Sequence, residues 1–154
     1  MSLDTLKTNR PMVLYGSLAG LVPFFASVLA TQFGLAGPGP FLVYSAIILA
    51  FLSGALWWFA LTAEEIAGDV PDESDRSDEP TLALALVLPA VAWLVLVMLP
   101  ERIIVLLLGL GFLTLWVWEV IKLRQIYSAG YMLLRTVLTA VVLLLHFWLL
   151  SIVN

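Results

Sequence analysis

Residues 11–63 read PMVLYGSLAGLVPFFASVLATQFGLAGPGPFLVYSAIILAFLSGALWWFALTA and contain no Asp, Glu, Lys or Arg. A transmembrane helix needs about 20 apolar residues, so this stretch is too long for a single span. The segment 34–40, GLAGPGP, has the density of Gly and Pro that is typical of a turn. The stretch therefore predicts a hairpin of two membrane-spanning helices, near 12–33 and 41–63.

The rest of the chain continues the pattern with three more apolar segments, near 81–99, 102–125 and 131–153. Hydrophobic residues make up 62% of the sequence and charged residues 12%, with a mean hydropathy of +1.07. Soluble domains average about 25% charged residues, so this chain has too little polar surface for a water-soluble globule. We predict an all-α fold, an integral membrane bundle of about five transmembrane helices that forms one domain over residues 1–154.

Residues 64–80 interrupt the apolar pattern with eight acidic side chains and one basic side chain. The segment has no apolar periodicity and contains Pro71 and Pro80, so we expect a solvated loop. Specific cation binding is the alternative. It is less well supported, because Arg76 stands among the acids and the Gly of a calcium-binding EF-hand loop is missing.

The distribution of Lys and Arg predicts the orientation of the bundle. With five spans, six basic residues fall on one side (Lys7, Arg10, Arg76, Lys122, Arg124 and Arg135) and only Arg102 on the other. We therefore expect a multi-pass protein of the bacterial inner membrane with a cytoplasmic N-terminus and a periplasmic C-terminus. The acidic loop would then also face the cytoplasm.

Ionisable residues inside a span are candidates for function, because burying them in lipid is costly. Glu119 lies shortly before the turn between the last two spans and Arg135 shortly after it, so both should lie at similar depth on neighbouring helices. We expect an ion pair between them, with pairing of Glu119 to Lys122 one turn later as the alternative. Proton relay or substrate binding at Glu119 is the functional alternative.

His146 is the single histidine, and it should lie deep in the last span, far from Glu119. We expect a neutral imidazole that bonds to Tyr44 or Ser45 on a neighbouring helix, with a proton-linked or quinone-head-group contact as the alternative. Ser53 suggests a serine hydrolase only weakly. The simpler interpretation is close helix packing at Ser53-Gly54, as at Gly16 and Gly20.

Several kinds of chemistry lack the residues they need. The chain has no Cys, which removes thiolate metal sites and cysteine nucleophiles, and one His is too few for a bis-histidine haem. No phosphate-binding Gly-rich motif or basic nucleic-acid patch is present. We therefore expect no catalytic residues, no cofactor, no metal and no nucleic-acid partner.

Two segments resemble a known family of small inner-membrane proteins: residues 18–24, LAGLVPF, and residues 44–57, YSAIILAFLSGALW. The similarity extends to Pro89 and to the basic end of the fourth apolar segment. The family is catalogued as domain of unknown function 3429 and includes a mitochondrial relative named as a transmembrane protein. Members have Gly where this chain has Trp58. The resemblance implies a multi-span inner-membrane protein and no catalytic residue.

These patterns favour a non-catalytic membrane component, such as an accessory, assembly or scaffolding protein of a larger inner-membrane complex. Its expected partners are the lipid bilayer and other inner-membrane proteins or a second copy of the chain. The alternative is a small carrier or channel for a proton, an ion or a small apolar molecule. Its polar path would have to use Glu119, Ser53, Gln32 and His146.

The orientation can be tested with topology reporters. A reporter fused to the C-terminus should behave as periplasmic, and one inserted near Asp75 as cytoplasmic, because Lys and Arg are retained on the inner side. Activities of alkaline phosphatase and green fluorescent protein fusions measure the two locations. Both reporters on one side would show that the number of spans is wrong.

Overall fold

The computed structural model describes residues 15–67, 79–123 and 127–153, and for residues 59 and 61–67 it describes the backbone only. Within these ranges the chain is helical, with no strand. The helices are α2 (Val22–Gln32), α3 (Gly39–Ala67), α4 (Glu79–Met98), α5 (Glu101–Lys122) and α6 (Ala129–Ile152). The all-α prediction is confirmed for the described part of the chain.

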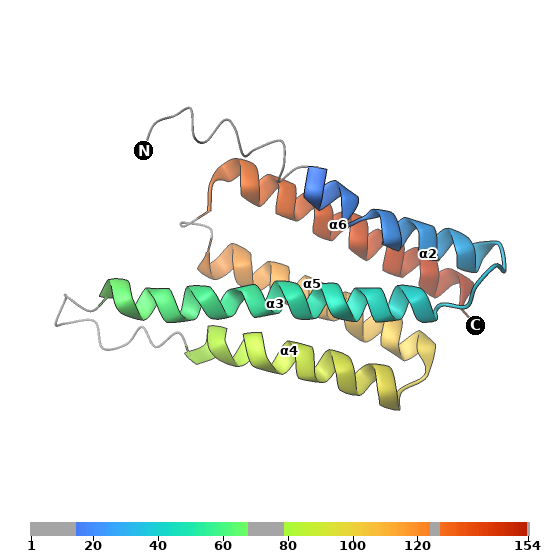
Figure 1. Ribbon diagram of the computed structural model, residues 1–154, viewed down its shortest axis with the longest axis horizontal. Helices are drawn as coiled ribbons and strands as arrows, with labels where there is room; N and C mark the ends of the chain where they lie inside the picture. Colours follow the sequence, from blue (N-terminus) through green and yellow to red (C-terminus); the bar gives the residue numbers. More distant parts are fainter. Residues whose placement is uncertain (1–14, 68–78, 124–126, 154) are drawn as a thin grey trace.

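The helices run alternately up and down along one bundle axis (Figure 1). α3 contacts α2, α4 and α5, while α6 packs against α5 and α2. One end of the bundle holds the α5–α6 connection and the start of α4, and we call it the α5–α6 end. The other, the α2–α3 end, holds the α2–α3 and α4–α5 turns.

Four of the described helices are long and apolar enough to cross a membrane: α3 over Gly39–Trp58, and α4, α5 and α6 over their full lengths. Their outward surfaces carry large apolar side chains, among them Phe51, Val97, Leu144 and Phe147, all more than half exposed. In water such a surface would be strongly unfavourable, whereas lipid chains cover it at no cost. The fold is that of a membrane-embedded helical protein.

The first predicted span, 12–33, is not one helix. Residues 15–19 are helical, a turn follows at Gly20 and Leu21, and α2 then begins at Val22. Pro23 explains the break, because its ring has no N–H and clashes with the carbonyl four residues earlier in a continuous helix. The 11 residues of α2 span only about 16 Å, half of a bilayer core.

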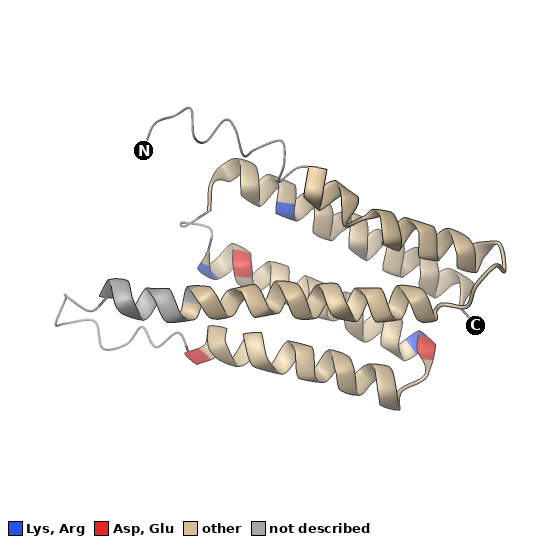
Figure 2. Ribbon diagram, viewed as in Figure 1, with Lys and Arg blue, Asp and Glu red and all other residues tan. Residues whose placement is uncertain are grey.

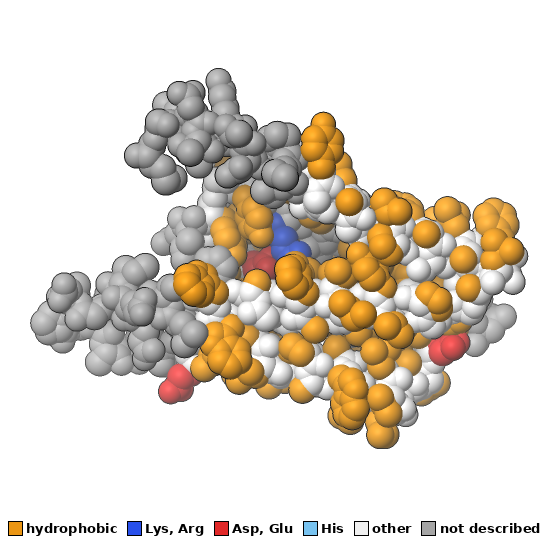
Figure 3. All heavy atoms as spheres, viewed as in Figure 1, with side chains coloured by type: hydrophobic (Ala, Val, Ile, Leu, Met, Phe, Trp, Pro, Cys, Tyr) orange, Lys and Arg blue, Asp and Glu red, His pale blue; other side chains and the backbone are white. Residues whose placement is uncertain are grey.

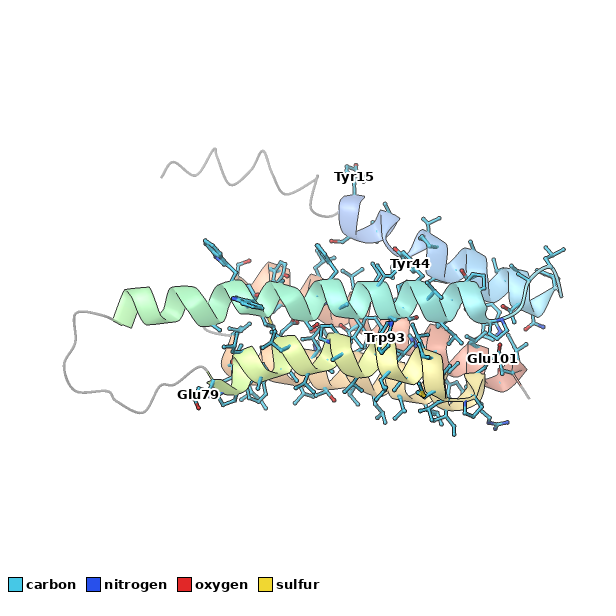
Figure 4. The ribbon with its side chains drawn as sticks, turned by 60° about the horizontal axis from the view of Figure 1, so that its bottom comes forward. Tyr15, Tyr44, Glu79, Trp93 and Glu101 are labelled. Atoms are coloured by element: carbon cyan, nitrogen blue, oxygen red, sulfur yellow. The ribbon has the colours of Figure 1, made fainter. Side chains whose placement is uncertain are left out.

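Tyr44 compensates for this break. Its hydroxyl donates to the Gly20 carbonyl over 2.9 Å, and the Tyr44 side chain points from α3 toward α2 (Figure 4). In an uninterrupted helix the Gly20 carbonyl would accept from the backbone N–H four residues later. The tyrosine therefore supplies a hydrogen bond that the proline interrupts, and it joins α2 to α3.

α3 is longer than predicted. It continues through residues 64–67 to Ala67, although these residues were predicted to belong to the acidic loop. Ala and Glu are favourable helix formers, and extending an existing helix needs no new nucleation. At the other end of the predicted loop, residues 79 and 80 belong to α4. Residues 68–78 lie outside the described residues, and so does any cation site there.

The predicted turn between the first two spans is confirmed. Gly34 has a positive φ of 68°, a conformation that costs Gly little, and the Leu35 N–H donates to the Ala30 carbonyl over 2.8 Å. At the opposite end, Ser128 precedes α6 and its side chain accepts from the Tyr131 N–H. Each connection thus satisfies backbone groups that a helix end leaves open.

Close helix packing occurs at glycines other than those predicted. A methyl group on Gly16 or Gly54 would meet no atom within 4 Å, and one on Gly20 would meet only backbone atoms of its own segment. The tight contacts are instead in α5. A methyl group on Gly111 would lie 2.6 Å from Cδ2 of Leu49 on α3. Gly111 therefore sets how closely α5 approaches α3.

A comparison of two alanine substitutions tests this contact. Gly111→Ala should lower the free energy of unfolding by about 1–3 kcal/mol, because Leu49 is 2% exposed and has little room to move. Gly109→Ala is the control, since a methyl group there meets its nearest neighbours at 3.7 Å. Thermal melting in detergent should show the lower midpoint for Gly111→Ala, and equal midpoints would contradict the proposed close contact.

Candidate functional site: a buried ion pair and a caged histidine

The predicted ion pair between α5 and α6 is confirmed. Arg135 Nε lies 2.7 Å from Glu119 Oε2, and Nη2 lies 2.9 Å from Oε1. The guanidinium and the carboxylate therefore form a bidentate ion pair. Glu119 is 5% exposed and Arg135 7%. A pair with this geometry in a poorly solvated place neutralises both charges and fixes the two helices relative to each other.

Two tryptophans extend this link at the α5–α6 end. The Trp116 indole donates to the Thr136 hydroxyl of α6, and the Trp118 indole donates to the Thr81 hydroxyl of α4, each over 3.1 Å. The last two turns of α5 thus bond to two of its neighbours, α6 and α4. The alternative pairing of Glu119 with Lys122 is not the one formed. The Lys122 ammonium lies over the Trp118 ring, 5.8 Å from its centroid.

Tyr127 and Tyr131 lie beside the pair. Their rings are 4.6 Å apart and tilted by 43°. Burial, together with the neighbouring Tyr131 and Glu119, raises the pKa of Tyr127 above its usual range. The Tyr127 phenol is therefore neutral at physiological pH and adds no charge next to the ion pair.

His146 lies far from the pair, in an aromatic cage. Its ring is 4.8 Å from that of Phe41, 5.6 Å from that of Phe112 and 6.3 Å from that of Phe24. The residue is 4% exposed. Arg135 and His146 are 11 positions apart on α6, which corresponds to about 16 Å along the helix axis. The expected separation of His146 from Glu119 is confirmed.

The predicted partners of His146 are wrong. His146 Nδ1 lies 2.8 Å from the Val142 carbonyl of its own helix, while the Tyr44 hydroxyl bonds to Gly20. Among the described residues, two buried side-chain polar atoms have no hydrogen-bond partner: Ser45 Oγ and His146 Nε2. Tyr44 still shares a neighbour with His146, because its ring lies 4.8 Å from that of Phe24.

Ser53 is fully buried and donates to the Ala50 carbonyl of its own helix over 3.1 Å. Hydroxyls inside apolar helices commonly bond in this way. Gln32 lies at the other end of the bundle, where its side-chain oxygen accepts from the Trp148 indole. The candidate polar residues are therefore spread along the bundle, and only Glu119 and Arg135 contact each other.

Sequence reasoning missed the surroundings of His146. Gly109 faces the imidazole, because a methyl group on this glycine would lie 3.7 Å from Cβ, Cγ and Cδ2 of His146. The only available signal was the Gly109-Leu110-Gly111 spacing in an otherwise bulky helix. No group of three or more His, Cys, Asp or Glu side chains that could hold a metal occurs within the described ranges.

The apolar helices and the buried, mutually neutralised charges of Glu119 and Arg135 define a membrane-embedded α-helical protein. In the comparison with protein families, the model described as Protein of unknown function (DUF3429) matches residues 9–151. The chain belongs to this family. No match was found among curated proteins or among solved structures.

The ion pair can be tested by removing one charge. Glu119→Gln should lower the free energy of unfolding by about 3 kcal/mol, because it leaves Arg135 uncompensated in a buried position. Unfolding of the detergent-solubilised protein, followed by tryptophan fluorescence, measures the change. Glu101→Gln, the same substitution at the exposed start of α5, is the control and should be neutral.

The charge-swapped double variant, Glu119→Arg with Arg135→Glu, should recover part of that loss, because it restores the attraction with the partners exchanged. A double variant less stable than both single variants would argue against a direct charge pair.

Proposed function

We propose that this protein is a non-catalytic component of the bacterial inner membrane that acts as an accessory, assembly or scaffolding subunit of a larger membrane complex. We propose further that it crosses the membrane several times, with its N-terminus in the cytoplasm and its C-terminus in the periplasm. The described basic residues support this orientation, since Lys122 and Arg135 lie at the α5–α6 end and Arg102 at the other (Figure 2).

The observation that carries the proposal is that the polar side chains of Glu119, Arg135 and Ser53 are bonded within the bundle. Glu119 and Arg135 neutralise each other, and the hydroxyl of Ser53 is bonded within its own helix. On α5, the two turns that precede Glu119 and lead toward the level of His146 carry the buried side chains of Leu115 and Phe112. An interior of this kind stabilises helix packing.

The outer face of α3, formed by Val43, Ile47, Phe51 and Gly54, supports a role in binding other membrane proteins. These residues are exposed and follow one another at intervals of three or four, so they form one stripe along the helix. Gly54 leaves open space between larger neighbours. Because glycine has no side chain, a second transmembrane helix can approach closely at such a position.

A small carrier is the second candidate, and one observation favours it. Arg135, Thr139 and His146 all lie on the buried face of α6, so a polar stripe runs along part of the bundle. A basic and an acidic side chain are also visible on the floor of a hollow between α6 and α3 (Figure 3). The weakness of this candidate is Val142, a buried apolar residue between Thr139 and His146.

The proposal can be tested by purifying the tagged full-length chain from membranes in mild detergent. The wild type should co-purify with one stoichiometric membrane partner, which would be another protein or a second copy. Gly54→Leu should lose this partner, because the new side chain prevents close approach to α3. Quantitative mass spectrometry and the mass of the purified complex measure both outcomes.

Ala90→Leu, at an exposed position of α4, is the matched control and should retain the partner. Both variants should reach wild-type levels in the membrane. A monomer in all three proteins would contradict the proposal. Dissipation of a proton gradient by the purified chain in liposomes, lost in Glu119→Gln, would favour the carrier instead.

A further inference from the structure

A groove between α5 and α6 is lined in part by His146. Its volume is about 190 Å³, and it is lined almost entirely by apolar side chains, including Leu106 and Leu110 of α5 and Phe147 of α6. Gly109 and His146 complete the lining. Leu110 is 55% exposed and Phe147 72%, so the groove opens toward the lipid rather than toward water.

The hydrogen bond of His146 determines what its other nitrogen can do. Nδ1 lies 2.8 Å from the Val142 carbonyl oxygen, and a carbonyl oxygen only accepts hydrogen bonds. Nδ1 therefore carries the proton, and in the neutral imidazole Nε2 is left with a lone pair. Nε2 is buried and has no partner among the described residues, which is an unfavourable state for a polar atom.

Gly109 is the reason that the groove reaches the imidazole. A side chain at this position would cover the Cβ, Cγ and Cδ2 edge of His146, since even a methyl group would lie 3.7 Å from these atoms. Nε2 is bonded directly to Cδ2. The absence of a side chain at Gly109 thus brings the groove to the Cδ2 edge of the imidazole, one bond away from the buried, unpartnered acceptor Nε2.

We propose that this groove binds a small lipid-soluble molecule with a hydroxyl group on an aromatic ring, a phenol or a hydroquinone, which donates a hydrogen bond to Nε2 of His146. The volume suits one substituted ring, because an engineered apolar cavity of about 150 Å³ binds benzene. The apolar walls exclude a charged head group. A quinone offers only acceptors, so the site should prefer the reduced form.

Binding of 4-fluorophenol to the full chain in lipid nanodiscs tests the proposal, with 4-fluoroanisole as the matched ligand that lacks the hydroxyl proton. Fluorine NMR titrations, corrected for partition into empty nanodiscs, give both affinities. Wild-type protein should bind the phenol about tenfold more tightly than the anisole, the gain expected from one buried hydrogen bond.

Three variants distinguish the contribution of the hydrogen bond to phenol binding from the contribution of the apolar groove. His146→Phe keeps an aromatic ring in the cage and should bind both probes equally. Gly109→Ala should weaken binding of the phenol while melting no lower than the wild type. Leu144→Trp, at an exposed position outside the groove, should retain the wild-type preference.

Equal affinity for the two probes in the wild type would overturn the proposal, and so would a preference for the phenol that persists in His146→Phe. The proposed role in a membrane complex does not depend on either result. That role is tested separately, by whether the Gly54→Leu variant loses its co-purifying partner.

Discussion

The rest of the bundle depends on the pairing of Glu119 with Arg135. Two opposite charges that are both more than nine-tenths buried must stay together, because separating them would leave each uncompensated where the dielectric constant is low. The pair therefore fixes the register of the antiparallel helices α5 and α6. In that register Trp116 meets Thr136, and Gly109, ten positions before Glu119, meets His146, eleven positions after Arg135. The link at one end of the bundle and the histidine environment farther along thus have a common origin.

The second constraint is Pro23. It interrupts the first apolar segment, so that α2 covers only part of the bundle's length (Figure 1). The Tyr44 hydroxyl satisfies the carbonyl that the break leaves open, and the same tyrosine ring packs against Phe24. One residue of α3 therefore contributes both a hydrogen bond and an aromatic contact to the position of α2. In lipid, where burial of apolar surface gives little driving force, such specific contacts decide how helices associate.

The sequence predicted those features that arise from charge, length and turn chemistry. The apolar segments identified the four long helices, the Gly and Pro residues of 34–40 identified the α2–α3 turn, and the positions of Glu119 and Arg135 relative to the α5–α6 connection predicted the ion pair. The faces of the helices could not be predicted in the same way. A helix that is apolar all round has no polar face to show which side points outward. Gly54 was therefore assigned to a packed interface and Gly109 and Gly111 were overlooked, and the partners expected for His146 were wrong for the same reason.

The length of α3 has a mechanical consequence. Its 29 residues form a rod of about 43 Å, whereas a hydrocarbon core is about 30 Å thick. Nine residues follow Trp58, where the membrane-crossing stretch ends, and they add about 13 Å of helix beyond it. A continuous helix transmits tilt along its whole length. A small change in the angle of α3 would therefore swing its far end, where Glu64 and Glu65 lie, through a wider arc than the part before Trp58.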